Sequence, residues 1–267
     1  AGALAAALKA DRCQILKDVD GVFTANPRVV PDARKLDEIT YDEMLELASA
    51  GSEVLQSRAV EFAKNYGVVL EVMSSFEVKP GTLVREEVEE MEQVIIRGIA
   101  ADKNQAKATL LGVPDTPGVA ARIFKELAAA NINVDMIVQN VSAAGITDVS
   151  FTVAKDDIAK TRRVIEPLVK EIRAAGLNFD PDIAKVSIVG VGMKSHSGVA
   201  YRMFDVLATR HINIEMISTS EIKISVVIRA GEADEAVRSL HGAFNLSVPP
   251  RKSPARRRPP ARTKSRK

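Results

Sequence analysis

The sequence predicts a mixed protein in which an α/β segment, residues 1–84, precedes two α+β units of the split βαβ type, one inserted in the other. The first observation is a repeat: residues 118–140 align with 198–220 without gaps, and 11 of 23 positions are identical. The second is the order of each unit, which reads as strand, helix, two strands and helix. The third is a strand-like run at 94–100 that has no neighbouring partner in the sequence.

The N-terminal segment shows alternating α and β patterns. CQILK, residues 13–17, is typical of a strand, and the spacing of Thr40 and Glu43 predicts a capping box that opens the helix YDEMLELASA. An amphipathic helix is expected at 52–66 and a strand at 68–76. The opening AGALAAALKAD resembles the end of a helix, so we expect that residues upstream of it are missing.

Each repeat unit begins with a β-rich run that turns through glycine into an amphipathic helix. The further predicted elements are strands at 133–141 and 148–153 and a helix at 156–174 in the first unit, and strands at 213–219 and 223–229 and a helix at 232–244 in the second. We expect Asp156 to cap its helix and Pro167 to bend it. The first unit finds a fourth strand near 177–179. The second has none downstream, so we infer that 94–100 completes its sheet.

The composition is that of a globular protein. Of 267 residues, 46% are hydrophobic and 27% charged, and no apolar run is long enough for a membrane span. Cys13 is the single cysteine, which excludes an intrachain disulfide and is typical of a reducing compartment, so we expect a cytoplasmic protein. His196, His211 and His241 have no spaced Cys or His partners, and we therefore expect no metal site.

The net charge of +2 is unevenly distributed. Residues 251–267 contain nine basic and no acidic side chains, whereas the remaining 28 basic residues face 35 acidic ones, a net charge of −7. We expect 247–267 to be a disordered basic tail, because it has too little apolar surface to offset the entropy of ordering. The tail is interpreted as a solvated appendage, with weak contact to nucleic acid or an anionic surface as the alternative.

The chain resembles aspartate kinase in the run DVDGVFTANPRVVPDARKLDEITYDEMLELASAGSEVLQSRAVEFA, in VMSSF and PGTLV, and in MKSHSGVA and ISTSEIKISVVI. The resemblance extends from about residue 3 to residue 246. It implies the C-terminal fragment of an amino-acid kinase domain, followed by two ferredoxin-like βαββαβ ACT domains. Their implied boundaries are 1–84 for the kinase fragment, 105–182 for the first ACT domain, and 183–246 with the strand 93–101 for the second.

The resemblance also implies an activity: ATP-dependent phosphorylation of L-aspartate to 4-phospho-L-aspartate in lysine, threonine and methionine biosynthesis. ATP with Mg²⁺ would be a substrate, no cofactor would be tightly bound, and the ACT domains would give feedback control by lysine, threonine or both. The family's Lys-Phe-Gly-Gly strand and glycine-rich loops, which hold the γ-phosphate and aspartate, are not found in this sequence. We therefore predict no catalytic residue in this fragment and expect it to be inactive alone.

Taken by itself, DVDG is typical of a turn. The resemblance instead implies that it flanks ATP, with the nucleotide contacts Lys17, Asp18, Phe23, Thr24, Ala25, Asn26, Pro27, Arg28 and Glu53. Arg28 could offer a bidentate cation to a phosphate. Lys17 stands where the family usually has Thr, and Glu53 stands where it has Lys. An acid facing the polyphosphate would weaken nucleotide binding unless it points away.

The turns before the repeat helices present helix N-terminal amides, which favour an anion such as the carboxylate of an amino acid. Asp115 could then receive the α-ammonium group, or it could simply cap its helix. The resemblance to ACT domains implies further contacts from the following strand. The predicted effector residues are Asp115, Gly118, Val119, Asn133, Val134, Asp135 and Gln139 in the first unit, and Ser195, Gly198, Asn213 and Ile214 in the second. Met136 and Met216 are interpreted as core residues.

Two other functions fit parts of the sequence. A split βαβ sheet also occurs in RNA-recognition modules, but the predicted strands offer essentially Phe151 alone for base stacking, so nucleic-acid binding by the folded part is disfavoured. The alternative to part of a catalytic aspartate kinase is a stand-alone regulatory ACT subunit that binds amino acids without catalysis. In either case we expect a homo-oligomer that pairs through its ACT domains, and no membrane association.

Overall fold

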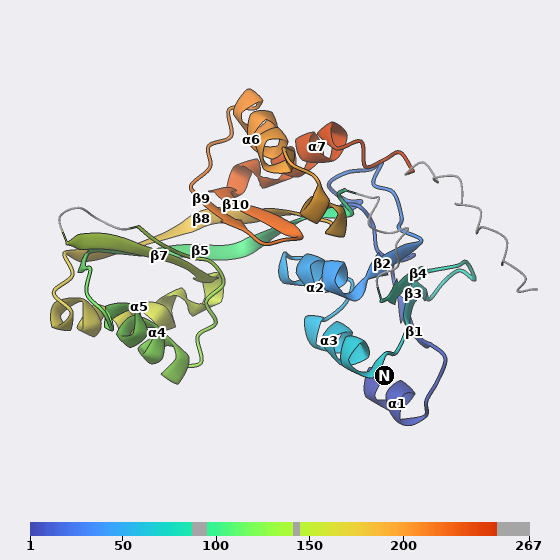
Figure 1. Ribbon diagram of the computed structural model, residues 1–267, viewed down its shortest axis with the longest axis horizontal. Helices are drawn as coiled ribbons and strands as arrows, with labels where there is room; N and C mark the ends of the chain where they lie inside the picture. The colour runs from blue at the N-terminus through green and yellow to red at the C-terminus, as the bar shows by residue number, and fades with distance from the viewer. Residues whose placement is uncertain (87–94, 141–144, 250–267) are drawn as a thin grey trace, which may run out of the picture.

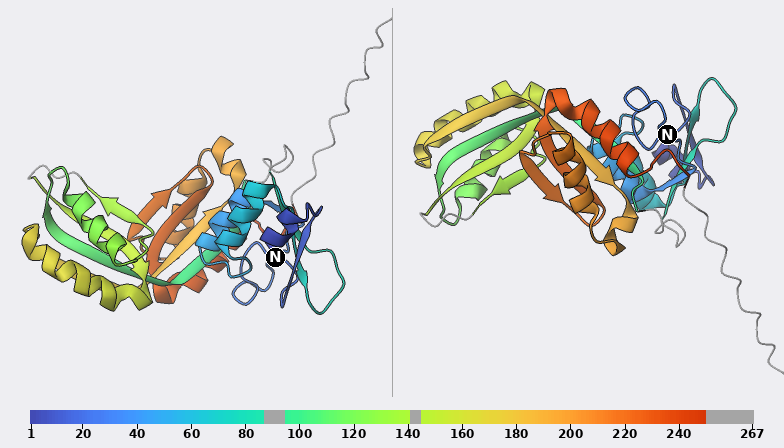
Figure 2. Two further views of the ribbon diagram at one scale, coloured as in Figure 1. Left: turned by 90° about the horizontal axis from the view of Figure 1, so that it is seen from below. Right: turned by 90° about the horizontal axis from the view of Figure 1, so that it is seen from above.

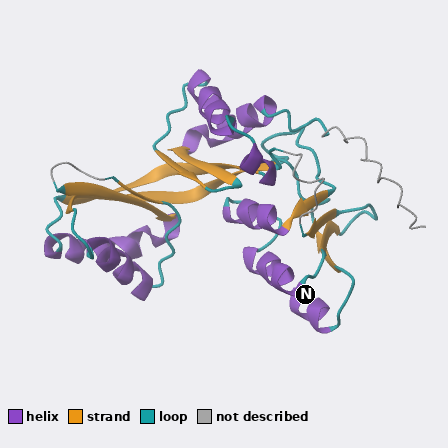
Figure 3. Cartoon of the chain, viewed as in Figure 1, coloured by secondary structure: helices purple, strands orange, loops and turns teal. Residues whose placement is uncertain are grey.

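The computed structural model describes residues 1–86, 95–140 and 145–249. Within them the chain forms a four-stranded sheet and a separate six-stranded sheet, with helices packed on both (Figures 1 and 3). The first sheet has the order β1-β3-β4-β2, in which β1 runs parallel to β3, and β2 runs parallel to β4. Its strands are β1 (Cys13–Lys17), β2 (Glu38–Thr40), β3 (Leu70–Ser74) and β4 (Thr82–Arg85).

Three helices accompany this sheet, namely α1 (Gly2–Ala7), α2 (Tyr41–Ser49) and α3 (Ser57–Tyr66). The predicted capping box is confirmed, because the hydroxyl of Thr40 accepts from the amide of Glu43 while the Glu43 carboxylate accepts from the amide of Thr40. The expectation of a helix from residue 52 is wrong at its start. The chain leaves α2 through Gly51 at φ +107°, and α3 begins five residues later than expected.

The six-stranded sheet has the order β6-β7-β5-β8-β10-β9. Its strands are β5 (Gly98–Pro114), β6 (Ile137–Gln139), β7 (Ile146–Ala154), β8 (Gly176–Val189), β9 (Met216–Thr219) and β10 (Lys223–Arg229). The two central strands are long, 17 residues in β5 and 14 in β8, and they run antiparallel beside each other. The predicted short strand at 177–179 is therefore only the beginning of a continuous one.

Both repeat units use these two strands. Residues 98–102 of β5 pair with 185–189 of β8, next to β10 and β9, whereas residues 107–111 pair with 176–180, next to β7 and β6. The run predicted at 94–100 does provide the fourth strand of the second unit's sheet, from Gly98 onward. Val94 lies outside the described residues. We call the part with β6 and β7 the first repeat unit and the part with β9 and β10 the second repeat unit.

The helices of the two units cover opposite faces of the shared sheet (Figure 1). The first unit carries α4 (Val119–Ala129) and α5 (Ile158–Glu171), and the second carries α6 (Val199–Thr209) and α7 (Ala233–Ala243). Each pair of helices closes a separate hydrophobic core. The first repeat unit lies at the end of the molecule away from the four-stranded sheet (Figure 2).

Several boundaries differ from expectation. The strands predicted from 133 and 213 begin only at Ile137 and Met216. Just before them, the amide of Asp135 donates to the carbonyl of Thr152, and the amide of Glu215 donates to the carbonyl of Val227. Residues 155–157 form a 3₁₀ turn, so Asp157 rather than Asp156 precedes α5, without a side-chain capping bond. Pro167 lies inside α5, and the bend that we expect from it stays a prediction.

Residues 250–267, which make up most of the predicted basic tail, lie outside the described residues. In the part that the structure describes, no helix is both long enough and apolar enough to cross a bilayer.

Candidate functional site

A cavity of about 330 Å³ lies where β5 turns into α4 of the first repeat unit. Gly118 makes this turn possible, since it precedes the helix at φ +96°, a conformation that favours glycine. The lining residues are Val113, Pro114, Asp115, Thr116, Pro117, Gly118, Val119, Ala120, Gln139 and Val149. The volume lies at the lower end of the range for small-molecule sites.

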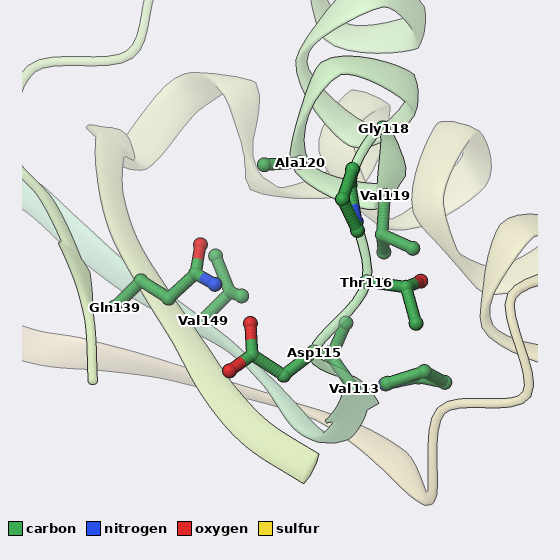
Figure 4. A pocket seen from close by; sticks show the side chains of 10 residues that line it. Val113, Asp115, Thr116, Gly118, Val119, Ala120, Gln139 and Val149 are labelled. Atoms are coloured by element: carbon green, nitrogen blue, oxygen red, sulfur yellow. The ribbon is translucent and has the colours of Figure 1, made fainter. Parts of the chain in front are cut away.

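Two polar side chains reach into this cavity from different elements. Asp115 comes from the turn after β5, and Gln139 comes from the edge strand β6 (Figure 4). The first turn of α4, at Gly118, Val119 and Ala120, forms another wall. A carboxylate, a side-chain amide and a helix N-terminus thus surround one space, which suits a small molecule that carries both a positive and a negative group.

Four of the predicted effector residues, Asp115, Gly118, Val119 and Gln139, line this one cavity. It places Asp135 differently, in an ion pair with Lys185 of β8. The Val119 amide donates to the carbonyl of Thr116 over 3.4 Å, a long contact. Asn133 is exposed and Val134 packs against the first unit's core, and neither lines this cavity.

Lys185 was missed by sequence reasoning. Its side chain is only 2% exposed, and its ammonium pairs with Asp135 and donates to the carbonyl of Ser49, 3.1 Å away at the end of α2. A second ion pair joins the two repeat units with the roles exchanged: Lys107 comes from the first unit and Glu215 from the second. Glu215 occupies the position of Asp135 in the alignment, so the carboxylate of each unit pairs with a lysine of the other unit on a shared central strand. The sequence does not reveal that this lysine is buried, because a single charged residue in a strand produces no hydrophobic periodicity.

The corresponding turn of the second repeat unit has a different form. Residues Val191–Ser195 make a 3₁₀ helix, and the imidazole Nδ1 of His196 lies 2.7 Å from the carbonyl oxygen of Gly192. Gly198 repeats the conformation of Gly118, with φ +89°. Asn213 is exposed and Ile214 packs against the second unit's core. Met136 and Met216 are buried together where the units meet, so their interpretation as core residues is confirmed.

The predicted nucleotide contacts lie on three separate segments. Lys17 is the last residue of β1 and Asp18 follows it; the Lys17 carbonyl accepts from the amide of Ser75 over 2.7 Å. Phe23 to Arg28 belong to a loop, residues 22–36, and Glu53 is exposed between α2 and α3. Within the loop, Thr24 and Ala25 are buried and Asn26, Pro27 and Arg28 are exposed, which leaves the Arg28 guanidinium accessible to an anion.

Thr24 joins this loop to the second repeat unit. Its hydroxyl lies 2.9 Å from Nε2 of His241 on α7, and its carbonyl accepts from the amide of Ile99 on β5 over 2.8 Å. Both Thr24 and His241 are buried. Burial lowers the pKa of His241 below its usual value, and the charge of Arg34 acts in the same direction while Asp32 opposes it. The site therefore favours the neutral imidazole over the charged one.

Helix α2 faces the second repeat unit with an acceptor on each turn. The Glu43 carboxylate accepts from the amide of Val191 over 3.0 Å, Glu46 pairs with Lys223 at 2.7 Å, and the carbonyl of Ser49 accepts from Lys185. Glu43 is completely buried and also lies 3.3 Å from Nε of Arg97. The N-terminal part and the repeat units are thus joined by polar contacts along one helix.

Acidification should destabilise the protein through His241. Because its folded-state pKa is lowered, the unfolded chain, whose histidines titrate near pH 6.5, takes up the additional proton as the pH falls through this range. We expect the midpoint of urea unfolding to fall between pH 7 and pH 5 by more in the parent than in His241→Gln, which cannot titrate. Equal falls in the two proteins would contradict this assignment.

Family models match both parts of the chain. Residues 1–74 match the model of the amino acid kinase family, and residues 109–167 and 186–244 each match the model of the ACT domain. The two ACT matches fall on the two repeat units, and the kinase match extends from α1 through β3.

Known proteins are similar over most of the chain. The aspartokinase of Pseudomonas aeruginosa is 58% identical over 251 residues, which are 93% of this chain and 61% of the relative, so the chain spans about three fifths of that relative's length. The solved structure of aspartokinase alpha and beta subunits is 51% identical with a TM-score of 0.54, over 56% of this chain and 99% of that chain. E. coli aspartokinase III in complex with aspartate and ADP is 30% identical with a TM-score of 0.79, over 91% of this chain and 54% of that chain. In its complex with lysine and aspartate the TM-score is 0.72 at 29% identity, over the same shares of the two chains.

Proposed function

Because this chain belongs to the aspartate kinase family, we propose that it is the part of such an enzyme in which an incomplete kinase domain is joined to two ACT domains that bind lysine or threonine as feedback effectors. The observation that carries the proposal is the cavity at the start of α4, where Asp115, Gln139 and the first turn of the helix meet. A free amino acid needs partners for a carboxylate and an ammonium group at once, and this arrangement offers both. The complex of a relative with lysine and aspartate supports the choice of effector.

We also propose that the N-terminal part contributes to ATP-dependent phosphorylation of L-aspartate in a cytoplasmic enzyme, with ATP and Mg²⁺ as substrate. A relative has been solved with aspartate and ADP. In this chain, Lys17 and Asp18 stand at the end of a strand parallel to β3, the kind of edge where α/β folds bind ligands. Arg28 is exposed and can pair with a phosphate, while the exposed Glu53 can turn to solvent.

The test is direct titration of this chain by calorimetry with lysine, with threonine and with MgATP. We expect at least one of the two amino acids to bind, and leucine, which carries the same backbone groups with an apolar side chain, to bind more weakly. Failure of both lysine and threonine to bind would contradict the effector proposal. Amino-acid binding without any binding of MgATP would favour a regulatory ACT subunit over part of the catalytic enzyme.

Self-association through the ACT sheets is a further prediction. The outer strands β6 and β9 have unpaired edges and present Ile137 and Ile217, equivalent positions of the repeat, at 51% and 46% exposure. We expect the parent chain to sediment as a dimer at micromolar concentration, and Ile137→Lys or Ile217→Lys to shift it toward the monomer. A monomeric parent at that concentration would count against pairing.

A further inference from the structure

The loop at 22–36 is a closed structure held at its base and its tip. The amide of Leu36 donates to the carbonyl of Val22 over 2.8 Å, and the amide of Thr24 donates to the carbonyl of Arg34 over 2.9 Å. At the tip, the side chain of Asn26 accepts from the amide of Arg28 over 3.0 Å. The backbone that presents Arg28 therefore depends on the contacts of Thr24, which lies between the base and the tip.

The middle of the loop packs into the second repeat unit's interior, whereas Val22 and Leu36 at its base belong to the core of the N-terminal part. Ala25 and Val30, which are 4% and 3% exposed, belong to the same hydrophobic core as Ile99 of β5 and Leu240 of α7. The loop is thus ordered from two sides, at its base by the N-terminal part and around Ala25 and Val30 by the ACT domain.

Thr24 is the polar centre of this contact. Its hydroxyl accepts from the amide of Arg34 over 2.9 Å, and its carbonyl accepts from the amide of Ile99 over 2.8 Å. Because this hydroxyl already accepts from Arg34, its own hydrogen can go to Nε2 of His241, in the neutral tautomer whose Nε2 carries no hydrogen. Each polar group of Thr24 is thus used, and one of its partners belongs to α7.

We propose that His241 is a positioning residue for nucleotide binding: from the second ACT domain it fixes Thr24, and through Thr24 the loop that presents Arg28 to the phosphates. The inference rests on the proposed nucleotide site. His241 does not touch the nucleotide in this scheme, and it acts only by holding the loop. The ACT domain would then influence ATP affinity through a direct contact, without any movement of the domains as a whole.

The test compares His241→Leu, which removes the acceptor, with His241→Gln, whose amide oxygen reaches to about the position of Nε2. Val237→Ala is the matched control, because it removes buried methyl groups from the same helix and keeps the hydrogen bond between Thr24 and His241. Hydrogen exchange at the amides of residues 22–36 should be about tenfold faster in His241→Leu, and close to the parent rate in His241→Gln. The affinity for MgATP should fall several-fold in His241→Leu and recover in His241→Gln.

Each outcome bears on the inference. Unchanged exchange in His241→Leu, or equal acceleration in Val237→Ala at matched stability, would overturn it, because the contact would then not hold the loop. Faster exchange with unchanged MgATP affinity would overturn the role in nucleotide binding. If the parent binds no MgATP while the loop responds as expected, the proposed nucleotide site is wrong and the positioning of the loop by His241 stands.

Discussion

Replacing Glu43 with alanine is expected to lower the free energy of unfolding by about 3–5 kcal/mol, the usual effect of removing one partner from a buried charged network. The Glu43 carboxylate is fully buried and accepts from the amides of Thr40 and Val191 at 3.1 and 3.0 Å, besides its ion pair with Arg97. Alanine removes all three contacts together and opens the junction between α2 and the second repeat unit. Urea unfolding of parent and variant measures the difference.

Glu46→Ala is the matched control, since Glu46 lies one turn further along α2 and pairs with Lys223 nearer the surface. Its loss should change the free energy of unfolding by less than about 1 kcal/mol. If Glu43→Ala costs no more than Glu46→Ala, the buried carboxylate does not hold the junction together.

Removing the Asp115 carboxylate should weaken amino-acid binding by roughly tenfold to over a hundredfold, equivalent to about 1.5–3 kcal/mol. In Asp115→Ala the α-ammonium group of the ligand loses its charged partner in the cavity, while the helix N-terminus that would receive its carboxylate is unchanged. Calorimetric titration of parent and variant with lysine and threonine gives the affinities.

The folded state should be affected much less, because Asp115 is exposed and its amide still donates to the carbonyl of Gly145. Thermal unfolding of the ligand-free proteins checks this point. If Asp115→Ala binds the amino acid as tightly as the parent, the geometry is wrong, and Ser195 with Asn213 in the second repeat unit becomes the better candidate.

Local features of the fold could be predicted from the sequence where a short spacing determines the structure. The capping box of Thr40 and Glu43 depends on four consecutive residues, and the repeat at Gly118 and Gly198 depends on direct comparison. The bonds from Glu43 to Val191 and Arg97 could not be predicted, because they join residues about 50 to 150 positions apart that only the folded chain brings together.

The same distinction applies to the candidate site. Asp115 and Gly118 were predictable because they lie on one turn, and Gln139 followed from the family resemblance. Asp135 was predicted as an effector contact, yet the structure pairs it with Lys185 of the neighbouring unit. A long-range ion pair of this kind leaves no periodic trace, so sequence reasoning could not tell a ligand contact from a structural one.

The shared central strands determine the order in which the two repeat units can fold during synthesis. Residues 107–111 and 176–180 enclose the first repeat unit, which is complete once the chain has been made to about residue 180. Residues 98–102 emerge from the ribosome early, but their partners at 185–189 follow more than 80 residues later. At translation rates of about 5–20 residues per second, this interval lasts several seconds. Throughout it, the nascent chain holds an unpaired strand end, and that end must stay free of other strands until its partner arrives.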